Sequence, residues 1–405
     1  MLGLQIRELL AQPRAAEFLH GLVSRGRLAN AYLFEGPAGV GKMTAALAFA
    51  RAILCRSTPP VASSPSESLG LFGDATPAPT STAPLDDACG TCATCRKAAS
   101  LNHPDLKFLF PVSGEERTLD QTIAETWETL RTDPLHVFLH EKASSIRLSQ
   151  TRELLRELAF KPFESSRRVV VVRDADRMRE DQASAMLKSI EEPGASTVWV
   201  LTSARPSRLP VTIRSRCQRV RFAPIPEEAI RATLERAAKV PAPLARTLAA
   251  LSAGSLGRAL ELRGRDQADA ERNAFDLLAP ALRQDPAALW VAAQKFMNYG
   301  RTGRDRLRAM ADFHLLWLRD VLRASCGAPL ESLVFAGREP EIRRQAAALD
   351  ATEIRRRMMV IEEMLRAIEG NVSADATMFS AMIRVAGQRP GEGEWPRHAT
   401  GRWAY

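Results

Sequence analysis

Gly36-Pro37-Ala38-Gly39-Val40-Gly41-Lys42-Met43 is the stretch of this chain that decides its fold. It fits the phosphate-binding pattern G-x-x-x-x-G-K, in which backbone N–H groups cradle phosphates and the lysine reaches the terminal ones. The apolar run 31–34 lies just before it, and the Ala- and Leu-rich segment 42–54 follows. A strand, a glycine loop and a helix in this order are the context that such a loop requires. The pattern predicts a nucleotide-binding α/β fold.

Met43 breaks this pattern at its last chemical position. The residue after the lysine is normally Ser or Thr, whose hydroxyl holds the magnesium ion of a bound nucleotide. A thioether is a soft ligand, whereas magnesium binds hard oxygen ligands. Thr44 offers a hydroxyl one residue later, but that position points elsewhere around the helix turn. We therefore expect magnesium to be poorly held, while binding of ATP or ADP stays open. The candidate nucleotide-binding residues of the loop are Gly36, Gly39, Gly41, Lys42 and Thr44.

A second acidic motif should follow a later strand and bind the same metal ion. It is an apolar run followed by Asp-Glu, and the Asp holds the magnesium ion. Here the apolar run is 169–172, and the next two residues are Arg173 and Asp174. A cation at the metal position opposes the ion by like charge. Met43 and Arg173 therefore affect the same ion, and we expect ATP hydrolysis by this chain to be weak or absent.

The size and composition of the chain indicate a globular protein of more than one domain. Its 405 residues exceed one ordinary domain, and two or three are expected. The net charge of +9 fits a nucleic-acid partner, but the many Arg and Ala residues fit the codon bias of a GC-rich genome equally well. No apolar run approaches the roughly 20 residues of a membrane span, and the N-terminal sequence lacks the order of a signal peptide. We expect a cytoplasmic protein without a membrane partner.

Apolar runs that alternate with helical patterns predict a mostly parallel α/β sheet in residues 1–223. The four valines at 169–172 are typical of a strand buried on both faces. Residues 57–88 interrupt this domain with six prolines among many Ser, Thr and Ala, and we expect this insertion to be disordered. The strands are expected at 31–34, 106–110, 169–172 and 197–201.

Beyond Pro224 the strand signals nearly vanish and helical patterns dominate. Pro224 indicates one domain boundary, and the turn near Gly264 indicates a second one. We therefore expect a small helical domain at 224–263, a larger helical domain at 264–388 and a loose tail at 389–405. The predicted fold class is α/β followed by all-α.

Three of the six cysteines lie at C-x-x-C-x-x-C spacing, at Cys89, Cys92 and Cys95. In a cytosolic chain such clustering favours a metal site over disulfides. An iron–sulfur cluster of the ferredoxin kind needs a fourth cysteine shortly after the third, and Ala99 stands there instead. Zinc is therefore favoured over iron–sulfur, with unliganded thiols as a further alternative. The cysteines interpreted as buried packing residues are Cys217 and Cys326.

A set of ordered motifs resembles the AAA+ subunits of the clamp loader of the bacterial DNA polymerase III holoenzyme. The resemblance covers residues 5–262 well and the helical remainder loosely, where Trp317-Leu318-Arg319-Asp320 fits. The degenerate nucleotide site favours the delta-prime subunit over the hydrolysing gamma/tau subunit. Besides the glycine loop and the cysteines, the matching motifs are Ala31-Tyr32-Leu33-Phe34, His103-Pro104-Asp105, Ser184 to Pro193, Leu209 to Cys217 and Gly254 to Leu260.

The resemblance implies an AAA+ P-loop domain with an inserted zinc module at 55–95, then a helical lid and a C-terminal helical collar. The family has a short gap after the first cysteine of the module, whereas residues 56–88 intervene here. This departure makes the first cysteine the ligand that most needs a structural test. The four thiolates implied for a structural zinc ion are Cys55, Cys89, Cys92 and Cys95.

The resemblance also implies roles for single residues. Arg216 matches an arginine finger, offered in trans to ATP on the neighbouring subunit to neutralise charge on the γ-phosphate. Arg258 matches the second sensor, which contacts the chain's own nucleotide, and Ser203 falls near the first sensor. Taken alone, Arg216 is one solvated arginine in an arginine-rich chain. Two other motifs are interpreted structurally: His103 as a packing and turn residue, and Glu191-Glu192-Pro193 as an exposed helix end.

The function implied is that of a stator-like subunit, which helps to load the sliding clamp on primed DNA during replication. Its partners would be the gamma/tau and delta subunits, the sliding clamp and, through the complex, primed DNA. One alternative is an active gamma/tau-like ATPase of the same complex, which Met43 and Arg173 oppose. The other is a zinc-containing DNA-binding module without a role in assembly.

Overall fold

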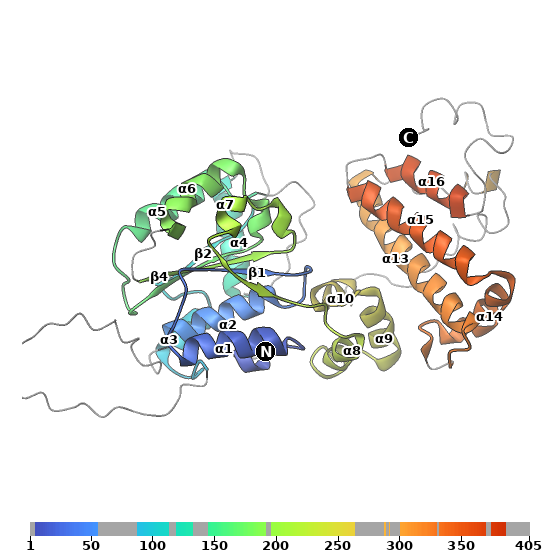
Figure 1. The fold of residues 1–405 in the computed structure, drawn as a ribbon, viewed down its shortest axis with the longest axis horizontal. Helices are drawn as coiled ribbons and strands as arrows, with labels where there is room; N and C mark the ends of the chain where they lie inside the picture. The colour runs from blue at the N-terminus through green and yellow to red at the C-terminus, as the bar shows by residue number, and fades with distance from the viewer. Residues whose placement is uncertain are drawn as a thin grey trace, which may run out of the picture. The chain divides into compact units, whose positions relative to one another are not determined.

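The computed structural model describes residues 5–55, 87–112, 119–132, 145–191, 196–263, 287–288, 291, 300–329, 332–369 and 374–385. The chain divides into two compact units, which are described separately (Figure 1). The first unit comprises 1–230 with 254–258, and the second comprises 231–253 with 259–405. Nearly all of the predicted insertion at 57–88 and the whole predicted tail at 389–405 lie outside the described residues.

A five-stranded parallel sheet in the order β2-β3-β4-β1-β5 forms the centre of the first unit. All four predicted strands are present, which confirms the parallel α/β fold, and β5 is an additional strand. It lacks an apolar run because only Val220 of its four residues is buried. The strands are β1 (Ala31–Glu35), β2 (Leu106–Leu109), β3 (Arg168–Val172), β4 (Thr197–Ser203) and β5 (Gln218–Arg221).

Helices cover both faces of this sheet, with α1 and α2 on one side and α5, α6 and α7 on the other (Figure 1). Alternate residues of β1 pack on opposite faces of the sheet, because successive side chains of a strand point in opposite directions. Tyr32 packs edge-on against Phe49 of α2 at a ring distance of 5.1 Å, whereas Leu33 belongs to the opposite core. The helices of this part are η1 (Ile6–Glu8), α1 (Pro13–Ser24), α2 (Lys42–Leu54), α3 (Ala93–Ala99), α4 (Leu119–Thr132), α5 (Leu148–Leu158), η3 (Ala175–Arg177), α6 (Glu180–Glu191), η4 (Pro206–Arg208) and α7 (Val211–Arg214). Helix α8 (Glu227–Arg236) begins in the first unit and ends in the second.

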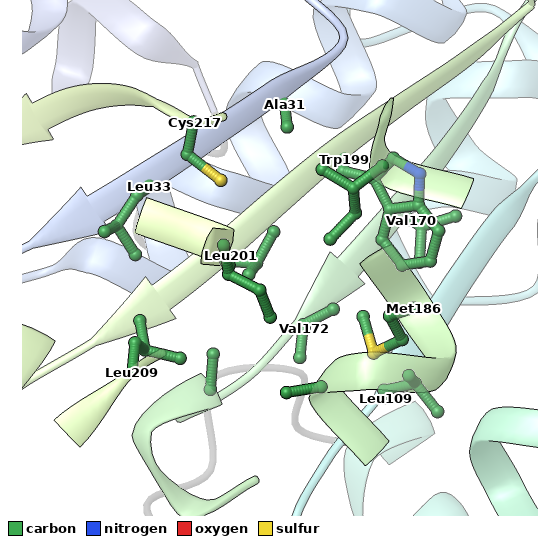
Figure 2. Close-up of a cluster of buried hydrophobic side chains, with 14 of the residues drawn as sticks. Ala31, Leu33, Leu109, Val170, Val172, Met186, Trp199, Leu201, Leu209 and Cys217 are labelled. Carbon is green, nitrogen blue, oxygen red and sulfur yellow. The ribbon is translucent and has the colours of Figure 1, made fainter. Parts of the chain in front are cut away.

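A buried apolar cluster lies between the sheet and helices α6 and α7 (Figure 2). Trp199 of β4 is fully buried in it, and its Nε1 donates a hydrogen bond to the carbonyl oxygen of Ser189 at 3.0 Å. This bond ties the last turn of α6 to the middle of the sheet. The labelled members of the cluster are Ala31, Leu33, Leu109, Val170, Val172, Met186, Trp199, Leu201, Leu209 and Cys217.

Gln12 ties the N-terminal segment to the segment that follows β5. Its side-chain amide donates to the carbonyl oxygen of Ala223 at 2.7 Å, and its Oε1 accepts from the N–H of Ala223 at 3.0 Å. Gln12 is buried, so both polar groups of its amide have partners away from solvent. The two hydrogen bonds satisfy both backbone polar groups of Ala223 and join two segments that are far apart in the sequence.

Asp105 organises the loop before β3. Its carboxylate is fully buried and accepts the N–H groups of Phe163, Glu164 and Ser165 at 2.6, 2.8 and 2.8 Å. The Nδ1 of His103 accepts the N–H of Asp105 at 3.1 Å, and His103 is also buried. The His-Pro-Asp motif is thus a turn whose acid holds a distant loop, in agreement with the structural interpretation of His103.

The second unit is helical in its described residues. Asp320 of α13 is buried, and its Oδ2 accepts the N–H groups of Val334 and Phe335 at 2.7 and 2.9 Å. Burial raises the pKa of this carboxyl group. Cys326 is exposed, so its interpretation as a buried residue was wrong: it follows the end of α13 instead of lying within its apolar face. The later helices are α9 (Ala242–Leu251), α10 (Leu256–Arg263), α13 (Gly300–Ser325), η6 (Ala336–Arg338), α14 (Glu339–Ala348), α15 (Ala351–Glu369) and α16 (Ala374–Val385).

Among the described residues, no helix combines the length and the apolar character that a membrane crossing requires.

Asp105→Ala is expected to lower the free energy of unfolding by roughly 3–5 kcal/mol, because three N–H groups lose one charged, buried acceptor. The measurement is urea unfolding of the full chain, followed by circular dichroism. Asp120→Ala is the matched control, because it removes an exposed carboxylate in the first turn of α4. The control should cost less than about 1 kcal/mol. Equal losses in the two variants would contradict the organising role of Asp105.

Candidate nucleotide site and metal centre

The glycine loop connects the end of β1 to the start of α2. Gly36 and Gly39 have positive φ angles of 152° and 72°. A Cβ at Gly36 would collide with the carbonyl oxygen of Phe222, and a Cβ at Gly39 would collide with Oγ of Ser255. Glycine is required at both positions by backbone conformation and by space. The loop is therefore held close to two other segments of the same unit.

Lys42 is the buried cation of this loop. Its Nζ donates hydrogen bonds to the carbonyl oxygens of Gly36, at 2.7 Å, and of Pro37, so the side chain closes the loop on itself. Burial lowers the pKa of Lys42 from 10.5 to about 8, while the charges of Asp174 and Asp176 act in the opposite direction. A bound phosphate would have to replace these carbonyl oxygens as the partner of the ammonium group.

The end of β3, where a magnesium-binding carboxylate was expected, carries the cation of Arg173. Arg173 directly follows β3 and is buried, and its Nε lies 3.8 Å from Oδ2 of Asp174. The N–H of Asp174 donates to Oγ1 of Thr202 at 3.1 Å, which joins the ends of β3 and β4. Neither Met43 nor Arg173 offers the oxygen ligand that magnesium prefers.

Asp176 is a buried carboxylate at this edge that no sequence motif predicted. Its Oδ1 accepts from Oγ of Ser203 at 2.9 Å and from the N–H of Ala204 at 3.2 Å. Its Oδ2 lies 3.3 Å from Nε of Arg205. Ser203, expected near the first sensor, is thus held by Asp176. The sequence signal that could have indicated Asp176 is its place as a second acid, two residues after Asp174.

The segment that carries Arg258 reaches the glycine loop. Residues 254–258 belong to the first unit, and the N–H of Gly257 donates to the carbonyl oxygen of Gly39 at 3.1 Å. The N–H of Arg258 donates to Oγ of Ser255 at 3.1 Å, near the start of α10. The structure therefore brings together the loop glycines, Lys42 and the segment of the predicted second sensor.

The four cysteines predicted as ligands also come together. The Sγ atoms of Cys55, Cys89, Cys92 and Cys95 all lie within 4.8 Å of one another. Cys55, the ligand in most need of a test, directly follows α2 and is part of the group.

The geometry of this cluster fits a four-coordinate metal ion. The Sγ atoms of Cys89 and Cys95 are 3.9 Å apart, close to the roughly 3.8 Å between two ligands of a tetrahedral zinc ion. Two backbone N–H groups donate to sulfur: Cys92 to Cys89 at 3.4 Å, and Cys95 to Cys92 at 3.3 Å. Burial, with Cys92 and Cys55 nearby, raises the pKa of the Cys95 thiol. A cation at this position would offset that effect and favour the thiolate.

Arg216 lies outside the glycine loop, on the turn after α7. Its Nε is 2.5 Å from Oε1 of Glu191, and its Nη1 donates to the carbonyl oxygen of Thr212 at 2.9 Å. The side chain of Arg216 is 40% exposed and that of Glu191 is 41% exposed. The sequence motif predicts Arg216 but not its acidic partner, because Glu191 lies on a separate element, at the end of α6.

The parallel sheet and the glycine loop between β1 and α2 define a P-loop protein of the α/β class. Within that class, the sequence model of the family described as "DNA polymerase III, delta subunit" matches residues 11–68 and 79–226, just over half of the chain. The chain belongs to this family, as the resemblance to clamp-loader subunits predicted.

Curated relatives agree with this assignment. DNA polymerase III subunit delta′ of Bacillus subtilis is 27% identical over 368 residues, which cover 91% of this chain and 94% of the relative. Subunit delta′ of Pseudomonas aeruginosa is 31% identical over 271 residues, or 66% of each chain. Subunit tau of Escherichia coli is 27% identical over 228 residues, 56% of this chain and 27% of the relative. The delta′ relatives support the delta-prime assignment.

Solved structures give weaker matches. The RuvB Holliday junction branch migration motor of Thermotoga maritima has a TM-score of 0.36 at 14% identity, covering 81% of this chain and 86% of that one. The DNA clamp loader delta protein of Bacillus subtilis has a TM-score of 0.27 at 12% identity, covering 92% and 99%. At these scores neither structure defines the arrangement of this chain.

Lys42→Met is expected to remove the contribution of Lys42 to the pH dependence of the free energy of unfolding. The folded chain releases the Lys42 proton near pH 8 and the unfolded chain near 10.5, so the unfolded state binds more protons between these values. The wild type should therefore gain stability relative to Lys42→Met as the pH rises from 8 to 10.5, by about 3 kcal/mol in total.

The measurement is urea unfolding of both proteins at several pH values between 7 and 10.5. All other titrating groups are shared, so the difference between the two proteins isolates Lys42. A difference that stays constant with pH would contradict the burial of the charged group.

Proposed function

We propose that this chain is a stator-like subunit of the DNA polymerase III clamp loader, which helps to load the sliding clamp on primed DNA while a neighbouring subunit hydrolyses ATP. The observation that carries the proposal is the contrast between two arginines. Arg173 is buried at the metal position of the chain's own site, whereas Arg216 is exposed and separate from that site. Arg216 would act in trans, because its guanidinium can neutralise charge on the γ-phosphate of ATP bound to the neighbouring subunit.

The proposed partners are the gamma/tau and delta subunits, the sliding clamp and, through the complex, primed DNA. Relatives named subunit delta′ and subunit tau support the first of these. The AAA+ domain would span 1–223, the helical lid 224–263 and the collar 264–388, where sister subunits would pack. ATP or ADP would bind at the glycine loop with Lys42 and Arg258, without a well-held magnesium ion.

A structural zinc ion is proposed for the cysteine cluster. Four sulfur ligands close the coordination shell and leave no position for a reacting water molecule, so the role would be structural. The ion would connect the end of α2 to α3, on the two sides of the insertion. Its binding free energy would add to the folding stability of the unit.

Cys92→Ser is expected to reduce the zinc content of the purified chain well below one ion per molecule, because a hydroxyl is a much poorer zinc ligand than a thiolate. Elemental analysis by mass spectrometry measures this directly. Cys326→Ser is the matched control, since Cys326 is exposed and outside the cluster, and it should keep the wild-type content. Unchanged zinc in Cys92→Ser would overturn the four-thiolate site.

Arg216→Ala is expected to lower the clamp- and DNA-stimulated ATPase of the reconstituted loader by roughly 10-fold or more, because the neighbour's ATP loses its finger. Assembly, checked by gel filtration, should be unaffected. Arg208→Ala serves as the control, because Arg208 is an exposed arginine on the nearby turn η4.

Full activity in assembled Arg216→Ala loader would overturn the finger assignment. ATP turnover by the isolated wild-type chain would instead favour the active-ATPase alternative. Tight DNA binding by the isolated chain, with no effect on a partner's ATPase, would favour the zinc-containing DNA-binding module.

A further inference from the structure

Glu191 is the last residue of α6, where the sequence suggested only an exposed helix end. The structure gives this carboxylate a specific partner, because its Oε1 lies 2.5 Å from Nε of Arg216. The two residues belong to separate elements that pack against each other, since α6 and α7 are in contact.

Both partners are anchored by buried neighbours in the same apolar cluster. Ile190, next to Glu191, is 2% exposed, and Cys217, next to Arg216, is 8% exposed. Trp199 holds the turn before Glu191 through its bond to the carbonyl oxygen of Ser189. Figure 2 shows Cys217 and Trp199 within this one cluster. The backbones on both sides of the ion pair are therefore fixed by the core, and the pair needs little further ordering.

The position of Glu191 is electrostatically unfavourable without a cation. The C-terminus of a helix carries partial negative charge, which disfavours a carboxylate there and favours a positive group. Arg216 supplies that positive group. Because an exposed ion pair contributes little to stability by itself, stability alone does not account for an acid at this position.

The contacts of Arg216 leave part of its guanidinium available. Its Nε forms the ion pair with Glu191, and its Nη1 donates hydrogen bonds to the carbonyl oxygen of Thr212 at 2.9 Å and to Oγ of Ser215 at 3.4 Å. Within the described residues, Nη2 has no such partner. A flexible arginine loses rotamer freedom when it binds an anion, and this cost is smaller if the side chain is already oriented.

We propose that Glu191 is a positioning residue for Arg216: it fixes Nε so that the remaining guanidinium N–H groups are presented to the γ-phosphate of the neighbouring subunit's ATP. The inference rests on the proposed function of Arg216 as a finger. Glu191 itself contacts neither nucleotide nor water in the reaction; it acts through the orientation of Arg216.

Glu191→Ala is expected to lower the kcat of the reconstituted loader's clamp-stimulated ATPase by roughly 3-fold to 10-fold, with an unchanged KM for ATP. The finger acts on charge that develops in the transition state, so kcat should respond and ground-state binding should not. Glu191→Gln keeps an oxygen acceptor at the same place and should recover a large part of the lost kcat.

Asp181→Ala is the matched control, since it removes an exposed carboxylate of the same helix that lies 3.8 Å from Nε of Arg179. It should leave kcat unchanged. The double variant Glu191→Ala/Arg216→Ala should be no slower than Arg216→Ala alone, because a positioning residue has no effect once its target is gone.

The outcomes separate the two hypotheses. If Arg216→Ala retains full activity, the finger assignment fails, and the role of Glu191 fails with it. If Arg216→Ala is impaired but Glu191→Ala matches the wild type, only the positioning role fails. A faster Glu191→Ala loader would also overturn it, since the ion pair would then restrain the finger instead of orienting it. Losses that add in the double variant would assign Glu191 an independent role.

Discussion

The pairing of β1 with a strand on each side is the constraint on which the rest of this unit depends. β1 lies between β4 and β5, and its hydrogen bonding continues past its end, where the N–H of Gly36 donates to Ser203 and the N–H of Phe222 donates to Glu35. Because all strands are parallel, their carboxyl ends meet at one edge, the place where α/β folds bind ligands. The glycine loop, Arg173 and Asp176 are close to one another for this reason.

The two functional regions of the unit have different physical characters. The sheet edge that carries the glycine loop is buried, and its charged groups have neutral polar partners within the unit: Lys42 has loop carbonyl oxygens, and Asp176 has the hydroxyl of Ser203. The turn after α7 is exposed, and its ion pair lies between elements anchored by the core. A site of the first kind suits a retained scaffold, whereas a site of the second kind suits a group presented to another molecule.

The sequence predicted what depends on local patterns. Four strands, the glycine loop and the group of Cys89, Cys92 and Cys95 follow from apolar runs and short spacings, whereas Cys55 was implied by the family resemblance; the structure has all of them. β5 was missed because an edge strand with one buried residue carries no apolar run. Asp105 and Glu191 stood in noted motifs, but their partners were not predicted, because those partners lie in other segments, which periodicity does not reveal. Asp176 had a local signal, but its burial depends on the meeting of β3 and β4.

The bond between Gln12 and Ala223 has a consequence for how the chain is made on the ribosome. At roughly 5–20 residues per second, about 10 to 40 s separate the synthesis of these two residues. β1 likewise emerges long before β4 and β5, so its unpaired N–H and C=O groups and its apolar side chains stay without native partners during that time. The native pairing of the first unit can therefore be completed only after residue 223 has left the exit tunnel.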